Sequence, residues 1–114
     1  VGASNDQPRR ARPMNLLNSG LSEKDIESIQ ETLRKYPKIT EAILYGSRAM
    51  GNYRPGSDID LTLRGADLSH QDLLDIELAL DDLLLPYKID LSLLHQLDNP
   101  QLIKHIARVG KSFL

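Results

Sequence analysis

The chain contains no cysteine and no tryptophan, and only one phenylalanine among its 114 residues. Without cysteine it can form neither a disulfide framework nor a thiolate zinc site, which is consistent with a reducing compartment. No apolar run reaches the roughly 20 residues that a membrane-spanning helix requires, and the N-terminus carries no pattern of a secretory signal. We therefore expect a cytoplasmic protein.

The chain also lacks an excess of positive charge. Its 14 Lys and Arg stand against 16 Asp and Glu, which gives a net charge of -2. Proteins that hold a nucleic-acid duplex by bulk charge usually carry a basic surface and a high pI, so direct nucleic-acid binding is not expected. A hydrophobic share of 40% beside 26% charged residues is typical of a globular protein. The length allows one domain.

The first residues differ in composition from the rest of the chain. Residues 1–13 carry three arginines, two prolines and no apolar periodicity, and Met14 follows them directly. We interpret this segment as a flexible tail, either a cloning remnant or an upstream extension, with Met14 as the natural start. The folded domain is therefore predicted to cover residues 14–114.

Capping signals and alternating apolar residues predict helices and strands that follow one another along the domain. Ser22 and Ser69, each followed by an aspartate three positions later, predict two helix starts, and Asn99 before proline predicts a third. Strands are predicted at residues 39–45, 58–63, 88–94 and, at the C-terminus, 112–114. This order favours an α/β (α+β) domain with a small sheet and helices packed on one face.

The helix predicted from residue 69 to about residue 84 is apolar on more than one side. One stripe and three further leucines make up its apolar set: Leu73, Ile76, Leu80 and Leu83 in the stripe, and Leu74, Leu78 and Leu85 outside it. Such breadth indicates either a helix covered on two sides or a surface reserved for another chain. A homo-oligomer and a hetero-oligomer are both compatible with it.

Two aspartates in one predicted strand indicate metal chemistry. Asp58 and Asp60 stand two positions apart in an extended segment, so their side chains leave the same face about 6 to 7 Å apart. Asp90 interrupts an apolar run in the next predicted strand and lies alongside them if the two strands are neighbours. Three like charges in one place are unfavourable unless a cation lies among them, and carboxylate oxygens favour Mg²⁺.

A segment that begins with glycine lies upstream of these acids. Gly46 and Ser47 close the first long predicted strand and open a short helix or turn. Glycine lets the backbone approach a phosphate closely, and free amides at a helix start attract anions. Arg48 and Arg54 supply positive charge nearby. Metal-binding acids that follow a phosphate-binding turn are the parts needed for phosphoryl or nucleotidyl transfer by two metal ions.

The spacing of these residues resembles a known enzyme family. A glycine-serine pair, an aspartate pair after a ten-residue gap and a third aspartate in a later strand resemble the DNA polymerase β superfamily of nucleotidyltransferases, here as Gly46-Ser47, Asp58-Ile59-Asp60 and Asp90. The run Gly46-Ser47-Arg48-Ala49 and the short chain are most similar to the minimal nucleotidyltransferase (MNT) antitoxins that accompany HEPN toxins. The resemblance covers residues 39–94 and implies a polymerase-β-like fold with a small mixed sheet.

The resemblance also implies a role for each residue of the motif. Asp58, Asp60 and Asp90 would hold two Mg²⁺ ions, and Gly46 and Ser47 would bind the terminal phosphates of ATP. Positive charge for the phosphates would come from Arg48 and Arg54. The implied reaction is attack on the α-phosphorus by a tyrosine hydroxyl of the HEPN toxin, which receives AMP while pyrophosphate leaves.

Two departures from the family pattern keep other functions open. Met50 stands where relatives often have a second arginine, and the chain has no separate C-terminal domain to bind the base and the acceptor. A module that silences a toxin by contact alone is one alternative. Nucleotide transfer to a small molecule such as an aminoglycoside is another, although little chain remains to build a pocket for it.

The remaining histidines and tyrosines do not form a motif. His70, His95 and His105 have no metal-ligand spacing and are predicted to lie at the surface, whereas Tyr45 is predicted to be a packing residue.

Overall fold

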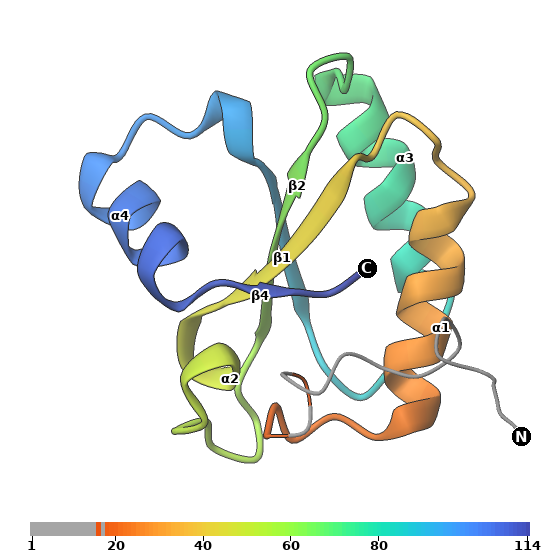
Figure 1. The fold of residues 1–114 in the computed structure, drawn as a ribbon. Coiled ribbons are helices and arrows are strands. Elements are labelled where there is room, and N and C mark those ends of the chain that lie inside the picture. The colour runs from red at the N-terminus through yellow and green to blue at the C-terminus, as the bar shows by residue number, and fades with distance from the viewer. Residues whose placement is uncertain (1–15, 17) are drawn as a thin grey trace, which may run out of the picture.

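A mixed four-stranded sheet forms the centre of the molecule. The structure is a computed structural model that describes residue 16 and residues 18–114, so the expected tail and the boundary at Met14 lie outside the described residues. The strands are β1 (Glu41–Tyr45), β2 (Ile59–Arg64), β3 (Ile89–Leu93) and β4 (Lys111–Ser112). Their order is β3-β2-β1-β4 (Figure 1). β1 is antiparallel to β2 and β4, whereas β2 and β3 are parallel, which confirms the mixed sheet.

The three long helices begin where the sequence predicts them. The helices are α1 (Glu23–Arg34), α2 (Gly46–Met50), α3 (His70–Asp81), the short 3-10 helix η4 (Leu94–Gln96) and α4 (Pro100–Val109). Ser22 caps α1 and Ser69 caps α3, each by accepting a hydrogen bond from the amide three residues later. Asn99 caps α4 with its side-chain oxygen. Such caps satisfy amides that have no partner inside the helix, and each contributes about 1 kcal/mol.

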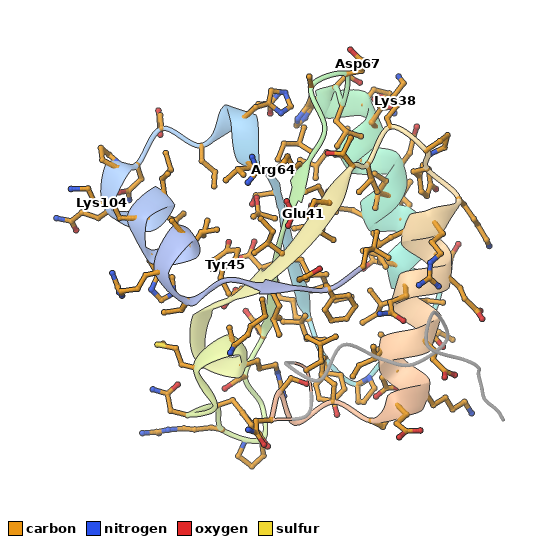
Figure 2. All side chains as sticks on the ribbon, in the orientation of Figure 1. Lys38, Glu41, Tyr45, Arg64, Asp67 and Lys104 are labelled. Carbon is orange, nitrogen blue, oxygen red and sulfur yellow. The ribbon has the colours of Figure 1, made fainter. Side chains whose placement is uncertain are left out.

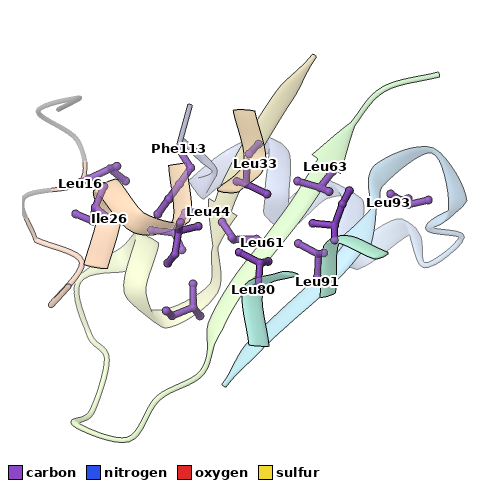
Figure 3. Close-up of a cluster of buried hydrophobic side chains, with 14 of the residues drawn as sticks. Leu16, Ile26, Leu33, Leu44, Leu61, Leu63, Leu80, Leu91, Leu93 and Phe113 are labelled. Carbon is purple, nitrogen blue, oxygen red and sulfur yellow. The ribbon is translucent and has the colours of Figure 1, made fainter. Parts of the chain in front are cut away.

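The main hydrophobic core lies between the sheet and the helices α1 and α3. Alternate residues of the central strands point into it, among them Leu44 of β1 and Leu61 of β2, both fully buried. Ile29 of α1 and Ile76 of α3 close it from the other side. Figure 3 shows these layers meeting, with Phe113 from the chain end beside Leu44. This packing fixes β2 and β3 side by side and thereby fixes the residues on their opposite face.

Helix α4 lies on the opposite face of the sheet from α1 and α3 (Figure 1). The sequence pattern predicted helices on one face only, and α4 is the exception. Ile106 of α4 is buried against Ile43 and Tyr45 of β1. Because β1 is apolar on both faces, it needs cover on both, and the amphipathic α4 provides the second cover.

The broad apolar surface of α3 is only partly used inside the chain. Ile76 and Leu80 are buried, and Leu73, Leu83 and Leu85 pack against the core from its edge. Leu74 and Leu78 remain exposed, at 40% and 64% of their surface. In the described part of the chain, no helix is both long and apolar enough to cross a membrane.

Candidate active site

The register of the sheet brings Asp60 and Asp90 side by side. Asp60 of β2 pairs with Asp90 of the parallel strand β3, and Tyr45 of β1 pairs with Asp60 on its other side. Residues directly opposite on neighbouring strands leave the same face, with backbones about 4.8 Å apart. Tyr45, Asp60 and Asp90 therefore form one row on the face that carries α4. Figure 2 shows Tyr45 on the α4 side of β1.

Asp58 joins this row from the loop that leads into β2. It lies two residues before Asp60, is exposed, and contributes to the electrostatics of that side chain. Burial raises the pKa of Asp60, the neighbouring carboxylates of Asp90 and Asp58 raise it further, and His105 lowers it. Within residues 16 and 18–114, none of the three aspartates forms an ion pair. The negative charge of the row is thus without a cationic partner in that part of the chain.

The three aspartates fit a divalent cation by their chemistry. As the side chains stand, no three His, Cys, Asp or Glu residues of the described chain come together closely enough to hold one ion. Asp58 and Asp90 are exposed, however, so their side chains can change rotamer without displacing packed neighbours. Carboxylate oxygens with uncompensated charge are the donors that Mg²⁺ prefers. The residues that could hold it are therefore Asp58, Asp60 and Asp90.

Gly46 places the start of α2 directly against this acidic row. Its φ is +75°, in the left-handed region that favours glycine. A Cβ at position 46 would collide with Oδ2 of Asp60. The turn between β1 and α2 can therefore approach the carboxylate only because residue 46 has no side chain.

Ser47 follows Gly46 at the start of α2 and is partly exposed. Its hydroxyl has no hydrogen-bond partner among the described residues. Because Gly46 is adjacent to Asp60, the turn at Ser47 and the acids of β2 lie at the same end of the sheet. This end combines a hydroxyl that is free to bind a ligand with uncompensated carboxylates.

Arg48 is placed differently from the expectation that it binds phosphate. Its side chain is only 2% exposed. Nε and Nη2 donate hydrogen bonds to the carbonyl oxygen of Ser57, at 3.1 and 3.0 Å, and Nη1 donates to that of Ser19, at 2.9 Å. The guanidinium carbon lies 5.0 and 4.8 Å from the ring centroids of Tyr53 and Tyr87. Arg48 therefore anchors the residue before Asp58 and does not present its charge at the surface.

Arg54 lies in the exposed loop that Arg48 anchors. Its backbone amide donates to Oγ of Ser57 at 2.8 Å, and the amide of Ser57 donates back to the carbonyl of Arg54 at 2.9 Å. These bonds close a turn of residues 54–57 just before Asp58. The guanidinium of Arg54 is outside this turn's hydrogen bonds and exposed, so its contact with phosphate remains a prediction.

His105 and Tyr45 also lie at the acidic row, although the sequence pattern predicted a surface residue and a packing residue. His105, expected at the surface, is half-buried, and its Nε2 accepts a hydrogen bond from the amide of Gly46 at 3.2 Å. The ring of Tyr45 meets that of His105 edge to face, with centroids 6.2 Å apart. Burial raises the pKa of Tyr45, a hydrogen bond with Ser92 lowers it, and the two aspartates beside it raise it. No sequence pattern predicts these contacts, because His105 is 59 residues from Gly46 along the chain and only the packing of α4 brings them together.

A protein-family model described as polymerase beta, nucleotidyltransferase, matches residues 27–114 of the sequence. No curated protein matches the chain. The similar solved structures include a toxin-antitoxin crystallised with AMP-PNP, which is 26% identical with a TM-score of 0.65 and aligns over 78% of this chain and 72% of its own. A variant of the toxin-antitoxin MntA-HepT is also 26% identical, with a TM-score of 0.58, over 75% of this chain and 68% of its own.

A third similar structure is the tri-AMPylated HEPN toxin of Shewanella oneidensis in complex with its MNT antitoxin. It is 23% identical with a TM-score of 0.62, over 82% of this chain and 72% of that chain, and at this identity it supports the fold alone. The family model, in contrast, spans well over half of the sequence and includes every residue of the acidic row. The chain belongs to the polymerase β family of nucleotidyltransferases.

Proposed function

We propose that this protein is an MNT-type antitoxin that transfers AMP from ATP to a tyrosine hydroxyl of a HEPN toxin. The observation that carries the proposal is the pairing of Asp60 with Asp90 on parallel strands, directly against the Gly46 turn. A 26% identical toxin-antitoxin crystallised with AMP-PNP supports ATP as the nucleotide and a toxin as the partner.

Each residue at this end of the sheet has a proposed role in the reaction. Ser47 and the Gly46 amide bind the β- and γ-phosphates, with Arg54 as an exposed cation at the rim. Asp58, Asp60 and Asp90 would hold Mg²⁺, which when bound would neutralise charge on the phosphates and on the leaving group. Arg48 takes no direct part and holds the loop before Asp58.

The chemical step is an in-line displacement at the α-phosphorus. The tyrosine oxygen forms the new P–O bond, the bond between the α-phosphorus and the bridging oxygen breaks, and pyrophosphate leaves with that electron pair. Asp90 lies at the exposed end of the row and accepts the hydroxyl proton, which passes on to solvent. The row thus combines charge stabilisation with a base, which are the two demands of the reaction.

Transfer of label from α-labelled ATP to a co-expressed HEPN partner tests this function. We expect magnesium-dependent labelling of a partner tyrosine, reduced at least about 100-fold in Asp60→Asn. Asp67→Asn is the control, because Asp67 is an exposed aspartate that follows the far end of β2 and lies away from the acidic row (Figure 2). Labelling that persists in Asp60→Asn would refute the proposed catalytic role.

Two other outcomes distinguish the alternative functions. Toxin silencing that survives Asp58→Asn, Asp60→Asn and Asp90→Asn together, with no label transferred, would identify a module that acts by contact alone. Pyrophosphate release with an aminoglycoside and without a second protein would identify a small-molecule acceptor. The exposed Leu74 and Leu78 favour a protein partner, because single-chain packing leaves them uncovered.

A further inference from the structure

His105 accepts a hydrogen bond from the backbone amide of Gly46, the amide that the proposed function assigns to the nucleotide. The amide of Gly46 donates a hydrogen bond to Nε2 of His105 at 3.2 Å. Accepting this bond requires a lone pair on Nε2, so the proton of the neutral ring is on Nδ1. A residue of α4 thereby reaches across to the turn between β1 and α2.

Packed neighbours on both sides hold the contact between Gly46 and His105 in place. On one side the backbone of Gly46 abuts the carboxylate of Asp60. On the other side the rings of His105 and Tyr45 meet edge to face, and their planes form an angle of 80°. Ile106, the next residue of α4, is buried against β1 and fixes the position of the His105 backbone. The ring is therefore directed at Gly46 by the docking of α4.

We propose that His105 is a placeholder: it holds the Gly46 amide in the nucleotide-free site and releases it to a phosphate oxygen when nucleotide binds. The inference rests on the proposed function, because it takes the Gly46 turn to be the phosphate site. An amide carries one N–H and donates one strong hydrogen bond at a time, so the ring nitrogen and the phosphate compete for it.

The geometry makes this exchange feasible without unfolding any element. The hydrogen bond is at the long end of the usual range, and its donor and acceptor are only partly buried. A rotamer change of the side chain alone moves the ring away, while Ile106 keeps α4 on the sheet. The exchange leaves no buried polar group unpaired, because the phosphate satisfies the amide and solvent satisfies the ring.

Titration of the full chain with AMP-PNP and Mg²⁺ tests the placeholder role. His105→Ala removes the competing acceptor, so we expect the affinity to rise about 2- to 10-fold, the usual net effect of one intramolecular hydrogen bond. His105→Gln keeps an acceptor oxygen near the place of Nε2, and we expect it to bind as the unchanged protein does. His95→Ala is the matched control, because His95 lies exposed on η4. Unchanged or weaker binding by His105→Ala would overturn the proposal.

A second measurement follows the backbone amide of Gly46 directly, first in the unchanged protein and then in the two histidine variants. The ¹⁵N–¹H resonance of Gly46 should shift when AMP-PNP and Mg²⁺ are added, and in the free protein it should shift in His105→Ala but not in His95→Ala. A Gly46 resonance that stays in place while AMP-PNP binds would overturn the placeholder role and the contact of the Gly46 amide with phosphate, but not the transfer of AMP, which the labelling experiment tests separately. No binding of AMP-PNP at all would overturn both.

Discussion

The carboxylate of Asp60 lies against the α-carbon of Gly46, in the space that a side chain at position 46 would fill. Gly46 directly follows β1 as the first residue of α2, and the antiparallel pairing of Tyr45 with Asp60 brings Gly46 next to that aspartate. The turn proposed to bind phosphate and the acids proposed to bind metal are therefore parts of one packed unit. We therefore expect a substitution in the turn to disturb the position of the acids, and a substitution of the acids to disturb the turn.

Gly46→Ala tests this packing. The new methyl group would meet Asp60, and the left-handed φ of +75° is strained for alanine, so we expect a loss of about 1 to 3 kcal/mol in the free energy of unfolding. Gly56→Ala is the control, because nothing lies within 4 Å of a Cβ at that position. Urea denaturation of both variants measures the difference. Equal stability of the two would show that the contact with Asp60 does not constrain the turn.

Arg48 and Arg54 are expected to behave in opposite ways when replaced by alanine. Arg48→Ala removes three hydrogen bonds to the carbonyl oxygens of Ser19 and Ser57 and should cost about 3 kcal/mol of stability. Arg54→Ala removes an exposed side chain and should change stability by no more than about 0.5 kcal/mol.

The KM for ATP provides a second comparison of the alanine variants of Arg48 and Arg54. If Arg54 contacts phosphate, Arg54→Ala raises the KM for ATP with little change in the melting temperature. Arg54→Ala with an unchanged KM would remove Arg54 from the proposed site. Arg48→Ala with full stability would contradict its role as the anchor of the loop before Asp58.

Asp60 is expected to reduce stability at neutral pH. Its folded pKa is raised, first by burial, so the folded state binds more protons than the unfolded state as the pH passes between the two pKa values. Stability therefore falls as the pH rises from the ordinary aspartate pKa of about 4 to the higher folded pKa. Asp60→Asn should be the more stable protein at pH 7, with a smaller difference near pH 4. Melting curves at both pH values measure this, and a less stable Asp60→Asn at pH 7 would contradict it.

Two leucines of α3 provide a test of the packing on that helix. Leu80 is 3% exposed within the core, so Leu80→Ala should cost about 3 kcal/mol of stability. Leu78 is 64% exposed, so Leu78→Ala should change stability by less than about 0.5 kcal/mol. Chemical denaturation of the isolated chain compares them. A large loss in Leu78→Ala would show that this face of α3 is covered in solution.

Local sequence patterns predicted the helices and strands, but not which residues of different strands and helices come into contact. The caps at Ser22, Ser69 and Asn99 are local hydrogen bonds, so short sequence signals were sufficient for the helix starts. Alternation placed Asp60 and Asp90 on the face away from the main core. Their direct pairing follows from strand order, which spacing along the chain does not determine.

The two residues that sequence reasoning placed differently take their positions from tertiary packing. The charge of Arg48 suggested phosphate, but the carbonyl oxygen of Ser57, in the following loop, and the rings of Tyr53 and Tyr87 enclose it. His105 was predicted at the surface because nothing in α4 indicates that it docks beside Gly46. A loop that folds back and a helix that docks both depend on the whole fold, and a single sequence carries no local signal for either.

Binding of Mn²⁺, followed by electron paramagnetic resonance in the presence of AMP-PNP, tests the central claim most directly. We expect the unchanged chain with AMP-PNP to retain two Mn²⁺ ions per bound nucleotide, more than the nucleotide holds alone, and we expect Asp60→Asn to lose this excess while Asp67→Asn keeps it. If the unchanged chain binds no more Mn²⁺ than the nucleotide does alone, the row of Asp58, Asp60 and Asp90 is not a metal site and the proposed chemistry fails.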